Sequence, residues 1–410
     1  MLVDTPSVLI KQKGQHVSLN GQIEYVVARV MGEVASPTKI NWLNTSFLIG
    51  MPIVSVIGVV LHWLYFGPPG WTEGIIFVGM YYACGLSITA GYHRLFAHRS
   101  HTAAWPLVFL YAFFGAGAFQ NSIIEWSSDH RNHHKFVDTH KDPYSAPRGF
   151  FYSHMGWIMI EENLFQNDFT NVKDLEKSAI IQWQHRNIFI IGGVSGWILP
   201  ALIGFLVGGL PTAVGGLVYG GLVRTVFVHH GTFLINSAAH IWGTQPYSDE
   251  NTSKDSFWLA FFTFGEGYHN FHHQFQADYR NGIRWYQFDP TKWWIKTLSS
   301  IGLTSNLKKT PEHSIVVSKL DMKYKRSARL LELKDVDTAL FEQRVSLYRE
   351  AMRNALFEMA KARKELKENI DSSKDKINDN INELKTSIIS IRVDINDLFS
   401  DMNNAKFALA

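Results

Sequence analysis

Four long apolar runs restrict the folds that this chain of 410 residues can adopt. Each run is close to the length of about 20 residues that a helix needs to cross the hydrocarbon core of a bilayer. The runs form two pairs with short connections, so we expect an all-α membrane protein with four transmembrane helices. The expected spans are residues 46–66, 73–90, 187–209 and 212–239.

Histidines gather in four short clusters outside these spans or at their ends. Two clusters, HRNHH and HNFHH, place histidines three and four residues apart, and such residues share one face of a helix. Each triplet can therefore aim its imidazoles at one point. The clustered histidines and one nearby asparagine are His93, His98, His130, His133, His134, Asn236, His240, His269, His272 and His273. They supply more nitrogen donors than one tetrahedral zinc ion accepts, so we predict two metal ions.

The remaining composition carries weaker signals. A histidine outside the clusters is most often a hydrogen-bonded packing residue. The single cysteine, Cys84, excludes an internal disulfide and a CxxC site. A net charge of +3 is too small to indicate a nucleic-acid partner. We therefore expect the chemistry at the clustered histidines and no binding of nucleic acid.

A fifth apolar run, residues 105–124, separates the first two clusters. If it crossed the bilayer, the clusters around His93 and His130 would lie on opposite faces and could not share a metal site. We therefore expect this run to be buried in the protein or to lie at the membrane interface. Positive residues between the second and third spans place the clusters and both termini on the cytoplasmic side. They are Arg94, Arg99, Arg131, Lys135, Lys141 and Arg148.

Residues from about 40 to 305 resemble the integral-membrane fatty acyl-CoA desaturases of the stearoyl-CoA, or delta-9, type. The resemblance rests on GLSITAGYHRLFAHRS, FQNSIIEWSSDHRNHHKFVDTHKDPYSAPRGFFYSHMGW, NSAAHIWGTQPY and GEGYHNFHHQFQADYRNG, in this order and spacing. It implies a cytoplasmic helical domain that caps the four spans and holds two iron ions through the clustered histidines, with Asn236 bound through a water. It also implies an O2-dependent reaction that inserts a cis double bond at the delta-9 position of a saturated long-chain acyl-CoA.

The same resemblance implies six substrate-binding residues, which are Asn44, Tyr81, Gly85, Asn121, Asp129 and Arg148. Tyr81 and Gly85 match positions that close the chain end of the acyl tunnel, and the other four match contacts to coenzyme A. Gly85 stands where alanine is expected, which favours a similar or slightly longer chain, although glycine also serves helix packing.

Two positions depart from the family pattern near the expected coenzyme A contacts. Ser128 stands where an arginine is expected, and Phe233 stands where a tryptophan is expected. The missing arginine removes a bidentate phosphate contact. The acyl carrier therefore stays open between coenzyme A, a membrane lipid and a carrier protein.

Neutral imidazole ligands need partners that hold a proton on the other ring nitrogen. Acids close to the clusters in sequence are candidates for this role. They are Glu125, Asp129, Asp138, Asp142, Glu266 and Asp278. Each acid is equally explained as a solvated or ion-paired surface residue, so spacing alone does not choose among them.

After Pro311 the chain becomes charged, and its apolar residues then follow a heptad spacing. The seam contains Phe341, Val345, Tyr348, Met352, Ala355, Met359, Ala362 and Leu366, then Ile377, Ile381, Leu384, Ile388, Ile391, Ile395 and Leu398. Such a seam predicts a coiled coil or a bent helical hairpin. We therefore expect three parts, an N-terminal cytoplasmic segment (1–40), a membrane desaturase domain (41–310) and a helical tail (311–410).

The implied reaction needs two electrons from a donor. The sequence contains no HPGG-type haem motif, no CxxC cluster and no convincing dinucleotide fingerprint. We therefore expect an external electron donor of the cytochrome b5, ferredoxin or reductase type. For the tail, homo-oligomerisation through residues 341–398 is the first hypothesis, and docking of the donor is the second.

Three other functions stay open on the sequence. A membrane hydroxylase and an acyl-lipid desaturase use similar histidine clusters, and a metal-binding membrane transporter is the alternative outside enzymes. A transporter holds its polar ligands near the bilayer midplane, whereas these clusters flank the spans. Product analysis, which separates an alkene from an alcohol, decides between the first two enzymes.

Overall fold

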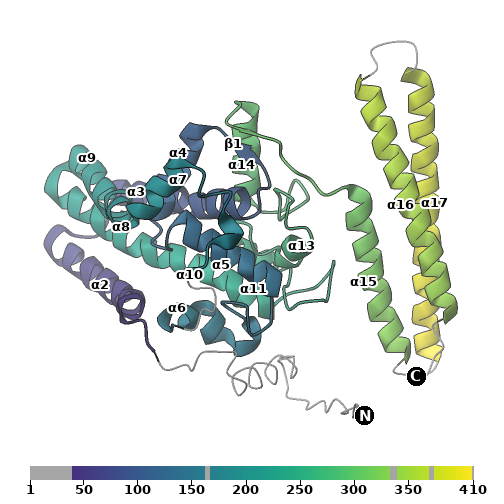
Figure 1. Ribbon diagram of the computed structural model, residues 1–410, viewed down its shortest axis with the longest axis horizontal. Coiled ribbons are helices and arrows are strands. Elements are labelled where there is room, and N and C mark those ends of the chain that lie inside the picture. The colour runs from purple at the N-terminus through teal and green to yellow at the C-terminus, as the bar shows by residue number, and fades with distance from the viewer. Residues whose placement is uncertain (1–38, 162–166, 333–338, 369–373, 409–410) are drawn as a thin grey trace. The chain divides into compact units, whose positions relative to one another are not determined.

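The computed structural model describes residues 39–161, 167–332, 339–368 and 374–408. The expected N-terminal segment, residues 1–40, lies almost wholly outside them. The chain divides into two compact units (Figure 1). The membrane unit comprises residues 1–244 and 251–309, and the tail unit comprises residues 245–250 and 310–410.

The first apolar pair forms two long helices of the membrane unit. α2 (Trp42–Phe66) begins after Asn41, whose side chain accepts a hydrogen bond from the backbone N–H of Asn44 at 3.0 Å. α3 (Trp71–Leu86) continues into the π-helical segment η1 (Ser87–Ala97), so that together they form an apolar helix of 27 residues. Both helices are long and apolar enough to cross a bilayer.

The second apolar pair lies in one helical stretch, Ile188–Ile241, which two glycines interrupt. Gly208 and Gly209 have non-helical backbone angles. The chain folds back after them. The close approach of the two segments is evident at Gly204, where a Cβ would collide with the carbonyl group of Thr212. By length and composition, the described residues contain three candidate spans. The third candidate is interrupted at Gly208 and Gly209, close to the boundary that we expected between the third and the fourth span. Its elements are α8 (Ile188–Gly193), η5 (Val194–Ile198), α9 (Leu199–Gly215), η6 (Gly216–Val223), α10 (Arg224–Asn236) and α11 (Ala238–Ile241).

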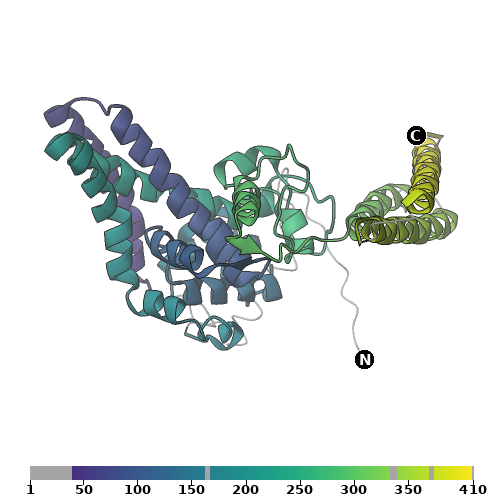
Figure 2. The same ribbon diagram turned by 90° about the horizontal axis from the view of Figure 1, so that it is seen from above.

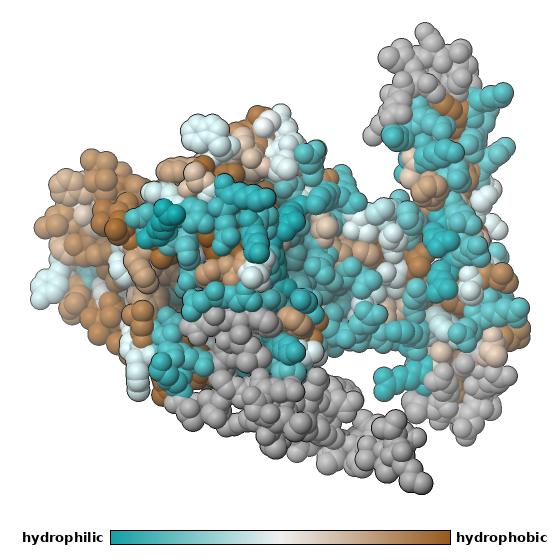
Figure 3. All heavy atoms as spheres, viewed as in Figure 1, coloured by the Kyte–Doolittle hydropathy of each residue, from teal (hydrophilic) through white to brown (hydrophobic). Residues whose placement is uncertain are grey.

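The long helices of the membrane unit expose apolar side chains. Figure 3 shows hydrophobic residues gathered over α2 and α9. Leu64 of α2 and Leu206 of α9 are each 75% exposed. Contact of such a surface with water is unfavourable by about 25 cal/mol per Å², a penalty that lipid removes. The membrane unit therefore has the surface of a membrane protein.

The fifth apolar run forms a short helix, α4 (Trp105–Ala116). Its 12 residues span about 18 Å, which is less than the roughly 30 Å of a bilayer core. Tyr111 and Ala112 are buried, whereas Trp105 is 72% exposed. A partly buried helix that does not qualify as a span agrees with our expectation for this run.

Short helices and loops make up the rest of the membrane unit (Figure 2). A small antiparallel pair, β1 (Thr102–Ala103) and β2 (Thr304–Ser305), joins residues that are far apart in the chain. The helices are α5 (Ile123–Phe136), η2 (Ala146–Arg148), η3 (Tyr152–Gly156), α6 (Trp157–Met159), η4 (Thr170–Val172), α7 (Ala179–Arg186), α12 (Phe257–Phe262), α13 (His269–Gln274) and α14 (Pro290–Ser300).

The tail unit consists of α15 (Glu312–Glu332), α16 (Ala339–Glu368) and α17 (Lys374–Ala408). α16 and α17 lie side by side (Figure 1), and an ion pair between Arg344 and Asp401 joins the start of one to the end of the other. The two helices are therefore an antiparallel hairpin.

The predicted heptad seam forms the core of this hairpin. Val345, Met352 and Met359 of α16 are buried in one apolar cluster with Ile388 and Leu398 of α17. The seam residues are thus occupied within one chain. Oligomerisation through residues 341–398 stays a prediction, and these buried side chains give it no support.

Candidate metal centre

Four elements of the membrane unit carry the nine clustered histidines. The first cluster lies on η1 and just beyond its end, the second on α5, the third on α11 and the fourth on α13. α5 begins with a capping box in which Ser122 and Glu125 satisfy each other's backbone N–H groups. In both triplets the spacing of three and four residues brings the imidazoles to one side of the helix, as the sequence predicts.

The nine imidazoles converge into two groups. The five-histidine group comprises His93, His98, His130, His134 and His272, and the four-histidine group comprises His133, His240, His269 and His273. In each group, one ligand nitrogen of every ring lies within 4.8 Å of the others. Both triplets contribute to both groups, so the two groups are adjacent.

The ring nitrogens face one another at distances that suit a shared metal ion. Nε2 of His272 lies 3.0 Å from Nε2 of His93 and 3.0 Å from Nε2 of His134. Nε2 of His269 lies 3.1 Å from Nε2 of His240. Two nitrogens that bind a metal at about 2.1 Å and at right angles are about 3 Å apart. A cation between them also relieves the repulsion of their facing lone pairs.

Hydrogen bonds on the far side of the rings determine which nitrogen carries the proton. Nδ1 of His93 lies 3.1 Å from Glu266, and Nδ1 of His133 lies 2.8 Å from Asp142. An ionised carboxylate can only accept a hydrogen bond, so each Nδ1 donates and each Nε2 keeps its lone pair for a metal.

Hydroxyl groups hold two further ligand rings. The Thr252 hydroxyl donates to Asp138 at 2.7 Å, so its oxygen accepts from Nδ1 of His240 at 2.8 Å. The Tyr144 hydroxyl lies 3.0 Å from Nδ1 of His130. Thr252 and Tyr144 were not predicted from the sequence, because only acids were candidates for this role and no motif marks these two residues.

Burial favours the neutral form that metal binding requires in most of these imidazoles. Burial lowers the pKa of His130, His269 and His272 well below the usual value of 6.5, and neighbouring imidazoles lower it further. A set of neutral nitrogen donors in two adjacent groups fits two transition-metal ions.

Three of the six candidate acids, Glu266, Asp142 and Asp138, contact ligand rings directly or through one hydroxyl. The remaining three acids are Glu125, Asp278 and Asp129. Glu125 caps α5, and Asp278 pairs with Arg280 at 2.8 Å. Asp129 lines a cavity beside the metal centre. Proximity in sequence therefore identified these six acids without separating the two sets.

This cavity, of about 240 Å³, extends to the five-histidine group. His93, His130 and Glu266 line its buried end, and Asn236 lies in the same wall. Asn236 thus lines the same cavity as His93 and His130, and its binding of a metal through a water stays a prediction. Phe47, Leu48 and Ile88 give the cavity an apolar lining.

The expected coenzyme A contacts divide between the cavity and its surroundings. Asn44, Asn121 and Asp129 line the cavity, as does Ser128, one of the positions that depart from the family pattern. Arg148 is not among the described residues of the lining, and its guanidinium stacks on the Tyr152 ring at 3.4 Å. Three of the four residues thus lie together.

The expected chain-end residues pack against an aromatic ring. The rings of Tyr81 and Phe264 are 4.7 Å apart. A Cβ on Gly85 would collide with the Phe264 ring, so the absent side chain makes room for phenylalanine. The extra space that we expected beside Gly85 is therefore filled in this structure.

A second opening reaches the five-histidine group from the protein surface. His98 and His134 are the two ligands of this group that are only partly buried. They line a hollow of about 220 Å³ together with Arg131 and Lys135. The five-histidine group thus has both an internal cavity and an external hollow beside it.

Comparison with known proteins identifies the family. A family model described as "Fatty acid desaturase" matches residues 69–300. The chain is 44% identical over 277 residues to a "Probable acyl-CoA desaturase" of Schizosaccharomyces pombe, covering 67% of this chain and 56% of the relative. It is 41% identical over 293 residues to "Acyl-CoA desaturase 1" of Saccharomyces cerevisiae, covering 70% of this chain and 55% of the relative.

A more distant relative carries a different acyl carrier in its name. The chain is 38% identical over 228 residues to the "sn-1 stearoyl-lipid 9-desaturase" of Synechocystis, covering 56% of this chain and 69% of the relative. The chain spans only about half the length of the two fungal relatives. The chain belongs to the fatty acid desaturase family, whose members are metal-dependent membrane proteins.

Proposed function

We propose that this protein is an O2-dependent acyl-CoA desaturase, which inserts a cis double bond at the delta-9 position of a saturated long-chain acyl group. The cavity carries the proposal, because its lining includes both apolar residues and His93, His130 and Asn236. An acyl chain in this cavity would bring a methylene group to the five-histidine group. The names of the fungal relatives support the acyl-CoA substrate.

The two histidine groups would each hold one iron ion, with Asn236 bound through a water. When bound, the iron pair supplies the activation of O2 that hydrogen removal from an unactivated methylene requires. With two electrons and two protons, O2 and the two hydrogens of the substrate yield two waters. The protein side chains contribute position and protonation state. Glu266 and Asp142 hold the proton on Nδ1 of their histidines.

Substrate binding is divided between the two ends of the cavity. The buried apolar end excludes water from the site of hydrogen removal. Asn44, Asn121 and Asp129 offer polar groups to the head of the substrate nearer the surface. Arg148, whose guanidinium stacks on the Tyr152 ring, would supply the cation that a phosphate contacts. We propose coenzyme A as the carrier, with an acyl lipid as the second candidate.

The carrier is tested by Arg148→Ala. Loss of a phosphate contact should raise KM for acyl-CoA with little change in kcat, because the interaction is equal in ground and transition states. Arg148→Lys keeps the charge and should recover part of the affinity. An unchanged KM for acyl-CoA would contradict this carrier and would direct the assay to acyl-lipid substrates.

For the membrane arrangement we propose four crossings, with the metal centre and both termini in the cytoplasm. The break at Gly208 and Gly209 supports a third and a fourth crossing within Ile188–Ile241. Accessibility labelling of single cysteines near His93 and His130 tests the arrangement. Labelling of these two positions from opposite faces would overturn it.

We further propose that an external donor delivers the electrons. The hollow beside His98 and His134 supports entry on the five-histidine side, since these two ligands are the ones nearest to solvent in that group. Its lining residue Lys135 favours an acidic donor surface.

Mass spectrometry of the lipids made by cells that express the chain tests the proposed reaction. A new cis alkene at the delta-9 position, dependent on iron and O2, is the expected product. A hydroxylated acyl chain would instead identify a hydroxylase. Unchanged lipids despite a loaded metal centre would contradict acyl oxidation altogether.

A further inference from the structure

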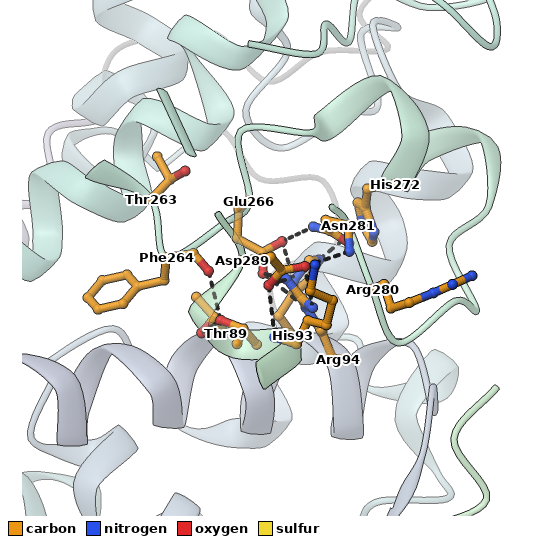
Figure 4. A network of polar contacts seen from close by, with 12 residues as sticks. Thr89, His93, Arg94, Thr263, Phe264, Glu266, His272, Arg280, Asn281 and Asp289 are labelled. Atoms are coloured by element: carbon orange, nitrogen blue, oxygen red, sulfur yellow. Dashed lines mark hydrogen bonds and ion pairs between the residues drawn. The ribbon is translucent and has the colours of Figure 1, made fainter. Parts of the chain in front are cut away.

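A buried arginine holds the acid that contacts His93. Arg94 follows His93 in η1 and is 1% exposed. It bonds to Glu266 at 2.8 and 3.1 Å, to Asp289 at 3.0 and 3.2 Å, and to the carbonyl oxygen of Tyr279 at 2.7 Å (Figure 4). A guanidinium has five N–H donors, so these five bonds use all of them. Every N–H donor of the Arg94 guanidinium therefore has an acceptor within the protein.

Asp289 connects this arginine to the protein backbone. It is fully buried and caps α14 by accepting the backbone N–H of Lys292 at 2.8 Å. It also accepts the backbone N–H groups of Asn281 and Gly282 at 2.9 and 3.0 Å. The direction of the Asp289 carboxylate is thus set by three backbone groups, which move less than side chains do.

Each oxygen of the Glu266 carboxylate accepts two hydrogen bonds. One oxygen accepts both bonds from Arg94, and the other accepts from Nδ1 of His93 and from the side-chain amide of Asn281. The preceding Gly265 has φ of +94°, and a Cβ there would lie 2.6 Å from Cα of Asp289. A rotation of Glu266 away from His93 would therefore break bonds to Arg94 and Asn281 as well.

We propose that Arg94 and Asp289 are positioning residues of the metal centre, which direct the His93 ring at the five-histidine metal position through Glu266. The inference rests on the proposed two-metal function. Asp289 touches no ligand, so its effect on His93 passes through Arg94 and Glu266. Changes to such outer partners of a metal ligand typically reduce metal affinity by about 10- to 100-fold.

The start of α14 also reaches the substrate cavity. The Thr291 hydroxyl donates to the carbonyl oxygen of Phe264 at 2.8 Å and lies 2.7 Å from the hydroxyl of Thr89. Thr89 lines the cavity, and Phe264 fills the space beside Gly85. One helix start, remote from the histidine clusters in sequence, therefore positions a metal ligand and part of the cavity wall together.

Asp289→Asn tests the positioning role in the full-length protein purified in detergent. Anaerobic titration with Fe(II) against a chelator should show about 10- to 100-fold weaker binding of one of the two ions, with the second ion unaffected. Mössbauer spectra should change for one iron only. Asp278→Asn is the matched control, because Asp278 is also a buried carboxylate and pairs with Arg280. Wild-type affinity for both ions in Asp289→Asn would overturn the proposal.

Two further variants keep the test informative if Asp289→Asn does not fold. Asn281→Ala removes one uncharged donor to Glu266 and should weaken the same ion, by less. Arg94→Lys keeps the charge but has three donors instead of five, so it should not restore wild-type affinity. Full affinity in Arg94→Lys would show that charge alone suffices and would overturn the geometric role.

These measurements separate the inference from the proposed reaction. If the wild-type protein binds two ions but forms no unsaturated product, the desaturase proposal fails while the positioning role stands. If product forms and every variant keeps both ions at wild-type affinity, the positioning role fails while the desaturase proposal stands.

Discussion

The membrane unit buries charged residues as well as apolar ones, whereas the buried residues of α15, α16 and α17 in the tail unit are apolar. In the membrane unit Arg94, Glu266 and Asp289 are at most 1% exposed, whereas Leu64 on α2 is 75% exposed. In the tail unit Leu398 is fully buried, and the ion pairs Arg344–Asp401 and Arg349–Asp321 lie at the surface. Both units are helical, so helical structure alone does not determine which types of residue are buried.

The difference indicates what holds each unit together. Burial of paired charges adds little stability compared with burial of apolar groups of similar volume. The buried charges of the membrane unit are better explained by a metal centre that needs oriented ligands. The tail unit needs no such explanation, because its apolar core resembles that of a water-soluble helical hairpin. Variants at buried positions of the two units should therefore affect different properties.

The largest expected effect follows from removal of a metal ligand in the membrane unit. His272→Ala removes the ring that lies 3.0 Å from both His93 and His134. Removal of a hydrogen-bond partner of a metal ligand typically reduces activity by up to about 100-fold. Loss of the ligand itself should reduce turnover by more than this and should lower the iron content. Product analysis and iron determination on the same preparation measure both effects.

The control for this variant is a histidine outside the two groups. His185 hydrogen-bonds to the Ser122 hydroxyl at 2.7 Å at the start of α5. His185→Ala should keep the wild-type iron content. Equal loss of iron in His185→Ala and His272→Ala would show that the two groups are not the metal centre.

In the tail unit the corresponding test is a buried leucine. Leu398→Ala leaves a cavity in the hairpin core and should destabilise the hairpin by about 2–5 kcal/mol. Hydrogen exchange of α16 and α17 in the full-length protein should accelerate, while iron content stays unchanged. Leu340→Ala, at a position that is 65% exposed, should change stability by no more than about 0.5 kcal/mol. Loss of iron in Leu398→Ala would contradict the separation of the two units.

A smaller effect should distinguish the two histidine groups within the membrane unit. Asp142→Asn and Glu266→Gln each weaken an Nδ1 hydrogen bond, so each should lower iron affinity by about 10- to 100-fold, in different groups. Glu266→Gln also leaves N–H donors of Arg94 facing an amide. It should therefore destabilise the metal-free protein by about 1–3 kcal/mol more than Asp142→Asn does. Equal melting temperatures of the two metal-free variants would contradict the role of Arg94.

The histidine ligands were accessible from the sequence, but their division was not. Residues three and four apart must share a helix face, so convergence of each triplet followed from spacing. Spacing could not show that His133 joins the four-histidine group while His130 and His134 join the other. That division depends on how α5 and α13 approach each other, which no local pattern encodes.

Some partners of the histidines and the use of the tail seam were not predicted from the sequence. Thr252 and Tyr144 contact ligand rings through loops and long-range packing, and Arg94 acts on His93 only through Glu266. A heptad seam is the same in a hairpin and in an oligomer. Its burial within one chain depended on the antiparallel pairing of α16 and α17.

One buried histidine should make the stability of the membrane unit depend on pH. Burial, with a smaller contribution from Arg94, lowers the pKa of His101 to about 3. In the unfolded chain the pKa is about 6.5, so between these values the unfolded state binds the additional proton and acidification destabilises the fold. For the metal-free protein, His101→Gln should reduce the dependence of unfolding free energy on pH by about 1.4 kcal/mol per pH unit below pH 6. Thermal melting of both proteins from pH 7 to pH 4 measures this, and parallel curves would show that His101 is protonated in the folded state.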